Sequence, residues 1–322
     1  MMLAASAVVL SLGLFVSACF QSAQAAQIAE RPDPAQAHAA DAGSSAAMGD
    51  FESVLSTDPA NVAARRGEVK AAIAQALLQR SAGKMDAALA TLVRAKQYFP
   101  NDPTILMDFG IQADSMGIFR DADAALRKAH QVAPSDAKIL YALAHVEVDE
   151  QKMPQAEADL RAYLRMRPSD ASARYGLGHL LHMMMRDDAA KRELKRSLAL
   201  QPHQTESWYE LGEIALDRHQ NVEATKDFET VLQRDPVHGG ALTGMGILAF
   251  HAKDYASAAR YLSQAVVQAP DYPAAHRFYA MVLTRMGNKQ QAEQEEERAR
   301  TLTENQNQLQ HGYTLLQQQQ NP

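Results

Sequence analysis

The sequence lacks most of the features that nucleic-acid-binding and disulfide-stabilised proteins carry. Its 322 residues include one cysteine, Cys19, so no disulfide bond can form within the chain. Lysine and arginine number 32 against 38 aspartates and glutamates, and no long basic block occurs. The chain therefore has no electrostatic footprint for nucleic acid.

Sequence patterns of catalysis are missing as well. No G-x-S-x-G, H-E-x-x-H or P-loop pattern occurs, and the spacing of serines and histidines does not group them as a triad. Asp187 and Asp188 are adjacent in a predicted turn, so they do not face each other as an acid/base pair would. The sequence predicts a protein that is not an enzyme and uses no cofactor, metal ion or small-molecule substrate.

What the sequence does contain is a strict period. Six prolines stand 34 residues apart, and they are Pro100, Pro134, Pro168, Pro202, Pro236 and Pro270. A period of this length indicates an array of helical repeats. If each proline is position 32 of a repeat, repeats begin at residues 69, 103, 137, 171, 205 and 239.

Two columns of this register predict how the helices of one repeat pack. Position 8 holds only small residues: Ala76, Gly110, Ala144, Gly178, Gly212 and Gly246. Position 24 holds large apolar residues: Leu92, Leu126, Leu160, Leu194, Phe228 and Leu262. Because glycine and alanine let two helices approach closely, we expect each large residue to pack over the small one.

These columns resemble the tetratricopeptide repeat family, whose W-x2-L-G pattern is clearest at Trp208, Leu211 and Gly212. The resemblance implies an all-α fold, a right-handed α-solenoid of helix-turn-helix repeats that stack on their neighbours. We expect the solenoid to cover 48–306, beginning with a partial repeat. The first helix of the repeat at 69 is expected to begin early, near Asn61.

The C-terminal end departs from the pattern. A seventh repeat at 273 has Glu296 and Glu304 where the apolar residue and the proline should be. Such polar positions suit a terminal repeat with no further neighbour. Residues 307–322 are predicted to form a capping helix with a glutamine-rich tail.

The N-terminal end predicts export and lipidation. Residues 1–18 are apolar and small, as in a signal peptide, and Val16-Ser17-Ala18-Cys19 resembles the bacterial lipobox. The resemblance implies that Cys19 carries lipid. Because Phe20 rather than aspartate follows, it also implies an outer-membrane lipoprotein facing the periplasm.

Two other outcomes stay open at this end of the chain. One is ordinary cleavage at Ala23-Gln24-Ala25, and the other is an uncleaved anchor, which the short apolar stretch disfavours. Residues 19–47 are rich in Ala, Asp, Ser and Gln and are predicted to be a flexible linker.

The resemblance also implies that the first helix of each repeat lines a concave, protein-binding face. The candidate residues are Tyr141, His145, Tyr175, His179, His182, Tyr209, Glu213, Phe250 and Arg277. Met107, Asp114, Asp149, Asp217 and His251 are expected on the same face. The three tyrosines would form a ladder, which is either a ligand surface or part of the framework.

His179 and His182 also raise the question of a metal site, because Met183, Met184 and Met185 follow them. The favoured interpretation is that the methionines fill gaps in packing and that one histidine meets solvent. We therefore predict no metal site there.

The leading functional hypothesis is a scaffold that is lipid-anchored in the bacterial cell envelope. It would bind a peptide or helix of a pilus, secretion or exopolysaccharide assembly machinery in its groove. The alternative is a soluble periplasmic adaptor or assembly chaperone subunit of a larger complex. Neither hypothesis includes catalysis or nucleic acid.

Overall fold

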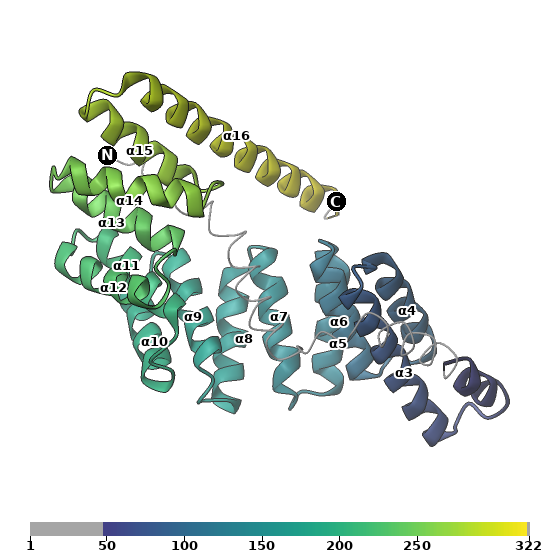
Figure 1. Cartoon of the computed structure of the whole chain (residues 1–322). Helices are drawn as coiled ribbons and strands as arrows, with labels where there is room; N and C mark the ends of the chain where they lie inside the picture. Colours follow the sequence, from purple (N-terminus) through teal and green to yellow (C-terminus); the bar gives the residue numbers. More distant parts are fainter. Residues whose placement is uncertain (1–47, 321–322) are drawn as a thin grey trace. The chain divides into compact units, whose positions relative to one another are not determined.

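The computed structural model describes residues 48–320, and the side chains of residues 48–309. Cys19, the apolar start and the whole predicted linker, 19–47, lie outside the described residues. The chain divides into two compact units after Pro168. We call residues 48–168 the N-terminal unit and residues 169–320 the C-terminal unit, and each is described by itself (Figure 1).

The described residues form helices throughout and contain no strand, which confirms the predicted all-α repeat fold. In the N-terminal unit, residues 48–57 are helical, and six helices follow: α3 (Val62–Ser81), α4 (Met85–Tyr98), α5 (Pro103–Ser115), α6 (Phe119–Val132), α7 (Ala137–Asp149) and α8 (Met153–Met166). The C-terminal unit holds α9 (Ala171–Met183), α10 (Asp187–Leu200), α11 (Thr205–Asp217), α12 (Asn221–Arg234), α13 (Gly239–His251), α14 (Tyr255–Gln268), α15 (Pro273–Arg285) and α16 (Lys289–Gln320).

Local sequence signals set the helix boundaries. Each of the six periodic prolines lies two residues beyond the end of a second helix, where it cannot continue the helix. Asn61, Asp102, Asp136 and Asp170 then cap the next first helix, because their side chains accept hydrogen bonds from its free backbone N–H groups. Asn61 is the reason that α3 begins at Val62, seven residues ahead of the proline register.

The C-terminal helix differs from the predicted one. α16 runs for 32 residues and crosses residue 306 without a break. Residues 307–320 therefore prolong the second helix of the last repeat and do not form a separate capping helix. The sequence contains no proline or glycine between Lys289 and Gln310 that would stop it.

The turn between the two helices of each repeat requires one left-handed residue. Gly83, Gly117 and Gly287 fill this position in three repeats, with φ from +74° to +85°. In the four repeats between them the position holds a residue with a side chain: Gln151, Met185, His219 and Lys253. A side chain in this region costs roughly 1–2 kcal/mol, so these four turns are strained.

The packing within each repeat follows the two columns. The six large residues at position 24 are each at most 1% exposed. A Cβ added to Gly246 would lie 2.4 Å from Cγ of Leu262, and one added to Gly110 would lie 2.6 Å from Cγ of Leu126. The large residue thus occupies the space that the glycine leaves open.

Phe228 shows how this packing also links neighbouring repeats. It is the largest residue of its column, and its ring would meet a Cβ added at Gly212 of its own repeat at 2.7 Å. The same ring would meet a Cβ added at Gly244 of the next repeat at 2.4 Å. The aromatic ring therefore needs two glycines, one on α11 and one on α13.

The first helices lie on the inner side of each unit. In the N-terminal unit α3 contacts α5 and α5 contacts α7, and in the C-terminal unit α9, α11, α13 and α15 contact one another in order. Within the described residues, no pair of successive second helices packs as closely as these first helices do. Closer packing on one side curves a stack of repeats, so the first helices line its concave face.

We expect Gly246→Ala to destabilise the protein by about 1–3 kcal/mol, because the new methyl group overlaps Leu262 in a filled core. Chemical denaturation measures the loss. The double variant Gly246→Ala with Leu262→Val should cost less than the sum of the two single changes, since the smaller side chain makes room. Strict additivity would contradict the proposed overlap.

Candidate functional site

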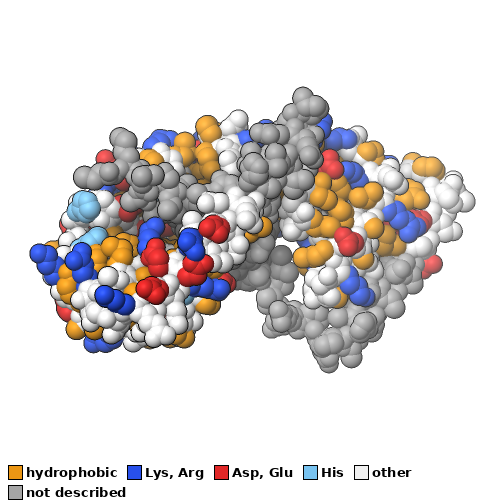
Figure 2. All heavy atoms as spheres, turned by 90° about the horizontal axis from the view of Figure 1, so that it is seen from above, with side chains coloured by type: hydrophobic (Ala, Val, Ile, Leu, Met, Phe, Trp, Pro, Cys, Tyr) orange, Lys and Arg blue, Asp and Glu red, His pale blue; other side chains and the backbone are white. Residues whose placement is uncertain are grey.

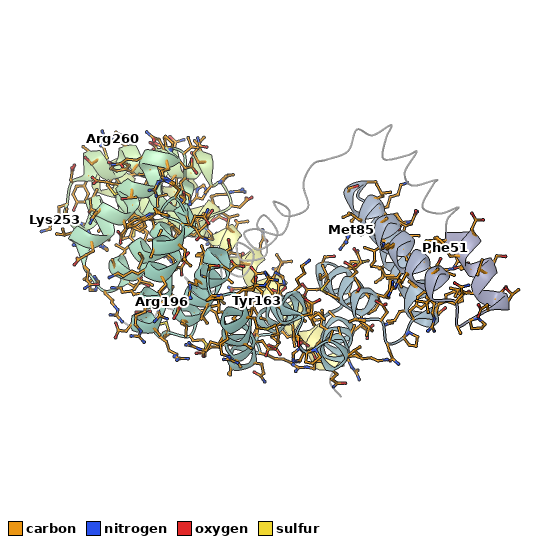
Figure 3. The ribbon with its side chains drawn as sticks, turned by 90° about the horizontal axis from the view of Figure 1, so that it is seen from below. Phe51, Met85, Tyr163, Arg196, Lys253 and Arg260 are labelled. Carbon is orange, nitrogen blue, oxygen red and sulfur yellow. The ribbon has the colours of Figure 1, made fainter. Side chains whose placement is uncertain are left out.

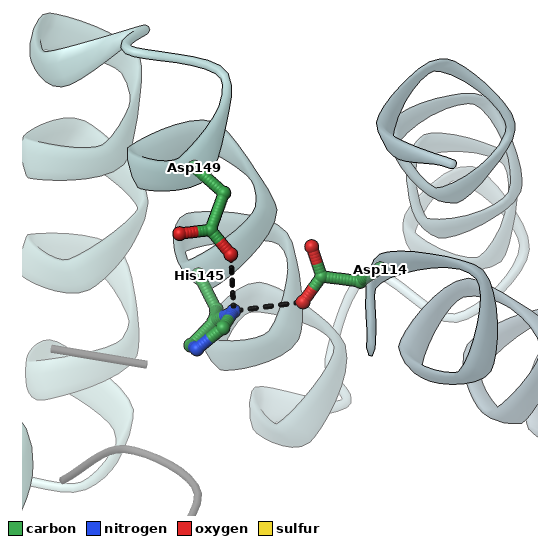
Figure 4. A group of neighbouring side chains, drawn as sticks. All are labelled: Asp114, His145 and Asp149. Carbon is green, nitrogen blue, oxygen red and sulfur yellow. Dashed lines mark hydrogen bonds and ion pairs between the residues drawn. The ribbon is translucent and has the colours of Figure 1, made fainter. Parts of the chain in front are cut away.

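The candidate site is the set of side chains that the first helices present on the concave side of each unit. In the N-terminal unit, His145 on α7 lies between two carboxylates. Its Nδ1 is 2.8 Å from Oδ2 of Asp114 on α5 and 3.5 Å from Oδ2 of Asp149, one turn along α7 (Figure 4). The predicted residues Asp114, His145 and Asp149 are thus brought together.

Electrostatics hold this group in place. Burial lowers the pKa of His145, but its hydrogen bond with Asp114 and the charges of both carboxylates outweigh burial and raise that pKa. Burial raises the pKa of Asp149 to about 6, against the attraction of His145 and with the repulsion of Asp114. The positive charge of one histidine therefore acts against the negative charges of two neighbouring carboxylates.

Two of the three tyrosines predicted to form a ladder, Tyr141 and Tyr209, pack on the framework. The Tyr141 ring is 5.0 Å from the ring of Tyr163 on α8, which is labelled in Figure 3. The Tyr209 ring is 4.9 Å from the His238 ring and 6.1 Å from Phe228. Since a Cβ at Gly240 would lie 2.7 Å from the Tyr209 ring, this tyrosine fills the space between α11 and α13. These contacts favour the framework interpretation.

His179 and His182 belong to a buried ionic cluster in the C-terminal unit. His179 Nδ1 is 3.1 Å from Oε1 of Glu210 on α11, and His182 Nδ1 is 3.0 Å from Oδ1 of Asp187 on α10. Arg218 closes the cluster by donating to Oδ2 of Asp187 at 3.0 Å and to Oδ1 of Asp188 at 2.7 Å. His182 also lies near Glu210, with its Nε2 4.0 Å from Oε1, so both histidines act on this acid.

This geometry corrects the prediction that one of the two histidines meets solvent. His179 is 4% exposed and His182 is 8% exposed. The opposite charge of Glu210 compensates for burial, which explains why the pKa of His179 is raised although burial alone lowers it. Met185 does not fill a gap either, because it is 68% exposed in the strained turn after α9.

Glu213 is an acid of the concave face. The side chains that act on its charge are Asp217, Glu210 and Tyr209, and none of these is basic. It lies half-buried on α11. Burial raises its pKa to about 8, the charges of Asp217 and Glu210 add to the rise, and a hydrogen bond with Tyr209 opposes it. At neutral pH this carboxyl is mostly protonated.

Aromatic and basic side chains meet at the other end of the C-terminal unit. The half-buried Phe250 on α13 lies edge-on to Phe278 on α15, with ring centroids 6.0 Å apart. The guanidinium of Arg277 lies 5.6 Å from the centroid of the Phe278 ring. We call Phe250, Arg277 and Phe278 the aromatic platform, since they combine a broad apolar face with one positive charge.

Sequence reasoning missed several of these partners. Glu210 and Phe278 were not among the predicted residues, although they stand at position 6 of their repeats, next to the chosen position 5. Asp187 was placed in a turn, whereas it is the first residue of α10 and bonds to His182. Glu210 lies three residues before Glu213, the chosen position 9 of the same repeat, and residues three apart share a helix face, so this spacing would have found Glu210.

The face in Figure 2 shows basic and acidic side chains interspersed.

Among the described residues, no helix combines the length and the apolar character that crossing a bilayer requires.

Comparison with known families decides the identity of the repeats. Two tetratricopeptide repeat models match the sequence, one at residues 141–183 and 215–273 and the other at residues 249–312. Residues 141–183 and 215–312 therefore carry tetratricopeptide repeats. Proteins of this family are scaffolds that present extended concave surfaces to protein or peptide partners.

Solved tetratricopeptide structures share the fold. A tetratricopeptide repeat protein from Parabacteroides merdae aligns with a TM-score of 0.62 at 15% identity, over 73% of this chain and 93% of its own. PilF of Pseudomonas aeruginosa aligns with a TM-score of 0.59 at 20% identity, over 67% of this chain and 99% of its own.

PilW, a type IV pilus biogenesis factor, aligns with a TM-score of 0.59 at 18% identity, over 67% of this chain and 98% of its own. At these identities the likeness establishes the fold alone. No curated protein matches the tetratricopeptide chain in sequence.

The raised pKa of Glu213 makes stability depend on pH. Between the ordinary value of 4.5 and about 8, the folded carboxyl holds a proton that the unfolded chain releases, so raising the pH lowers the free energy of unfolding. Glu213→Gln removes this term. We expect the variant to gain stability over the wild type as the pH rises from about 5 to about 8.

Denaturation of both proteins at the two pH values measures this gain. Glu296→Gln, at an exposed position of α16, controls for the loss of one negative charge. An equal difference between wild type and Glu213→Gln at both pH values would show that Glu213 is ionised in the folded protein.

Proposed function

We propose that this tetratricopeptide array is a non-catalytic scaffold of the bacterial cell envelope that binds an extended peptide or a helix of an assembly machinery. The observation that carries the proposal is the aromatic platform on the concave side of the C-terminal unit. Phe250 and Phe278 offer apolar area, and Arg277 offers one charge, on helices that are held firmly by the repeat packing. Such a combination suits a segment with both apolar and polar side chains.

Two further observations support the envelope part of the proposal. The apolar start and the Val16-Ser17-Ala18-Cys19 sequence favour export and a lipid on Cys19. PilW, which shares the fold, is a type IV pilus biogenesis factor. We therefore propose an outer-membrane lipoprotein that faces the periplasm and serves pilus, secretion or exopolysaccharide machinery.

The second candidate function is a soluble periplasmic adaptor or assembly chaperone subunit. Ala23-Gln24-Ala25, a possible ordinary cleavage site, is the observation that favours it. The two candidates share the concave binding face and differ in whether the protein is anchored.

The anchor can be tested by intact mass and membrane fractionation of the wild type beside Cys19→Ala. We expect the wild type to gain the mass of a lipid and to partition with membranes, and the variant to lose both properties. Because Cys19 is the only cysteine, no other thiol can carry the lipid. If both proteins are soluble and cleaved after Ala25 or Ala26, the adaptor is the better proposal.

The binding face can be tested by placing a photo-crosslinking residue at single positions in the producing cell. We expect Phe250 and Arg277 to give a defined crosslinked partner, because both lie on the concave side. Val222 on α12 and Val267 on α14, which are 83% and 70% exposed on second helices, serve as matched controls.

Mass spectrometry of the crosslinked species identifies the partner, and circular dichroism confirms that each variant is folded. A partner captured at Val222 or Val267, with none at Phe250 or Arg277, would move the binding surface to the convex side.

A further inference from the structure

Three metal-ligating side chains converge in the N-terminal unit, independently of the aromatic platform. Asp114 comes from the last turn of α5, while His145 and Asp149 lie one turn apart on α7 (Figure 4). One nitrogen and two carboxylate oxygens of these residues all lie within 4.8 Å of one another. The three side chains belong to two successive repeats and meet on the concave side.

We propose that Asp114, His145 and Asp149 bind a divalent transition-metal ion, for which Zn²⁺ is the best-matched probe. Imidazole nitrogen together with two carboxylate oxygens is a ligand set that zinc accepts, whereas calcium and magnesium prefer oxygen alone. The ion would take the place of the proton that His145 shares with the two acids.

The distances between the His145 nitrogen and the two carboxylates fit the replacement of the proton by zinc. Ligands that lie about 2.0–2.1 Å from a tetrahedral zinc ion are themselves about 3.3 Å apart. The Nδ1 atom of His145 lies 2.8 Å from one carboxylate oxygen and 3.5 Å from the other, on either side of that value. Small rotations of the side chains would therefore suffice to coordinate the ion.

The charges also favour a cation at this point. Asp114 is 10% exposed, and its second oxygen, Oδ1, is buried without a hydrogen-bond partner. The charges that act on Asp149 are those of His145, which attracts it, and of Asp114, which repels it, so two acids crowd one histidine. A divalent ion would neutralise both carboxylates at once, and it could use the unpaired oxygen of Asp114 as well.

The buried cluster of the C-terminal unit provides a contrast. His182 also faces an acid, but there Arg218 donates to both Asp187 and Asp188. That cluster already has its cation. The His145 group has the same histidine–acid contact, with a second acid, Asp149, beside the histidine.

The group is partly open, which bears on what the ion would do. Side chains of His145 and Asp149 are 16% and 22% exposed, so an ion held by three protein ligands would keep a position for water or for a ligand from a partner. Because the ligands come from α5 and α7, the ion would also fasten two successive repeats together.

The test is zinc titration of the full chain after treatment with a chelator, in competition with a chromophoric zinc indicator. We expect one zinc per chain in the wild type. His145→Gln, Asp149→Asn and Asp114→Asn should each weaken binding at least about tenfold, because each removes one of three ligands. His182→Gln is the matched control and should bind as the wild type does.

Two further measurements separate loss of a ligand from loss of the fold. Circular dichroism without zinc shows whether each variant is folded, and zinc should raise the melting temperature of the wild type and of His182→Gln but not that of His145→Gln. Binding should also weaken from about pH 7.5 to about pH 5, because protons compete for His145 and the carboxylates.

Equal zinc affinity in the wild type and His145→Gln would overturn the proposal and assign the zinc to other surface groups. Loss of binding in His182→Gln alone would place the site in the C-terminal unit instead. Neither result would affect the crosslinking test of the aromatic platform, which does not involve these residues.

Discussion

The fold depends on one steric fit, repeated along the chain: a large apolar side chain on the second helix of a repeat packs over a glycine or an alanine on the first. Without this close approach, the two helices could not bury Leu126, Leu194 or Leu262 completely. The fit also explains why one repeat departs from leucine. Phe228 is accommodated because Gly212 and Gly244 both lack a side chain, so the larger residue and the second glycine belong together.

Much of the fold could be predicted from the sequence because its determinants are local and periodic. The prolines end the second helices, and aspartates such as Asp102 and Asp136 begin the next ones, within a few residues of each other. The length of α16 could not be predicted from the repeat register, because the register ends where the helix continues. Beyond the register, α16 continues because no helix-breaking residue interrupts it, and the 34-residue period says nothing about where such a helix ends.

The candidate site was less predictable, since its properties depend on pairs that are distant in sequence. His145 and Asp114 are 31 residues apart, and so are Arg218 and Asp187. Whether a histidine at position 9 meets solvent depends on the residue that the next first helix places opposite it. For His179 that residue is Glu210, which turns an expected surface histidine into a buried one. The register locates the face, but not the contacts made on it.

Acids that lie close together on the same inner helix have different environments in both units. Two histidines hold the pKa of Glu210 below its ordinary value, whereas Glu147 is fully buried and bonds to Arg127, yet burial raises its pKa to about 7. Glu213 and Asp149 have weaker compensation and raised pKa values. Polar groups that folding leaves poorly compensated are common where a protein binds something else.

The uneven contacts between repeats have a mechanical consequence. Neighbouring first helices pack against each other more closely than neighbouring second helices do, so each unit can bend about its first helices. Within each unit, the second helix of a repeat also packs against the next first helix, so such bending is a small sliding of packed helices, whereas stretching would pull the inner helices apart. The curvature of each unit can thus adjust to bound segments of different thickness, while the spacing of the side chains on its inner helices stays fixed.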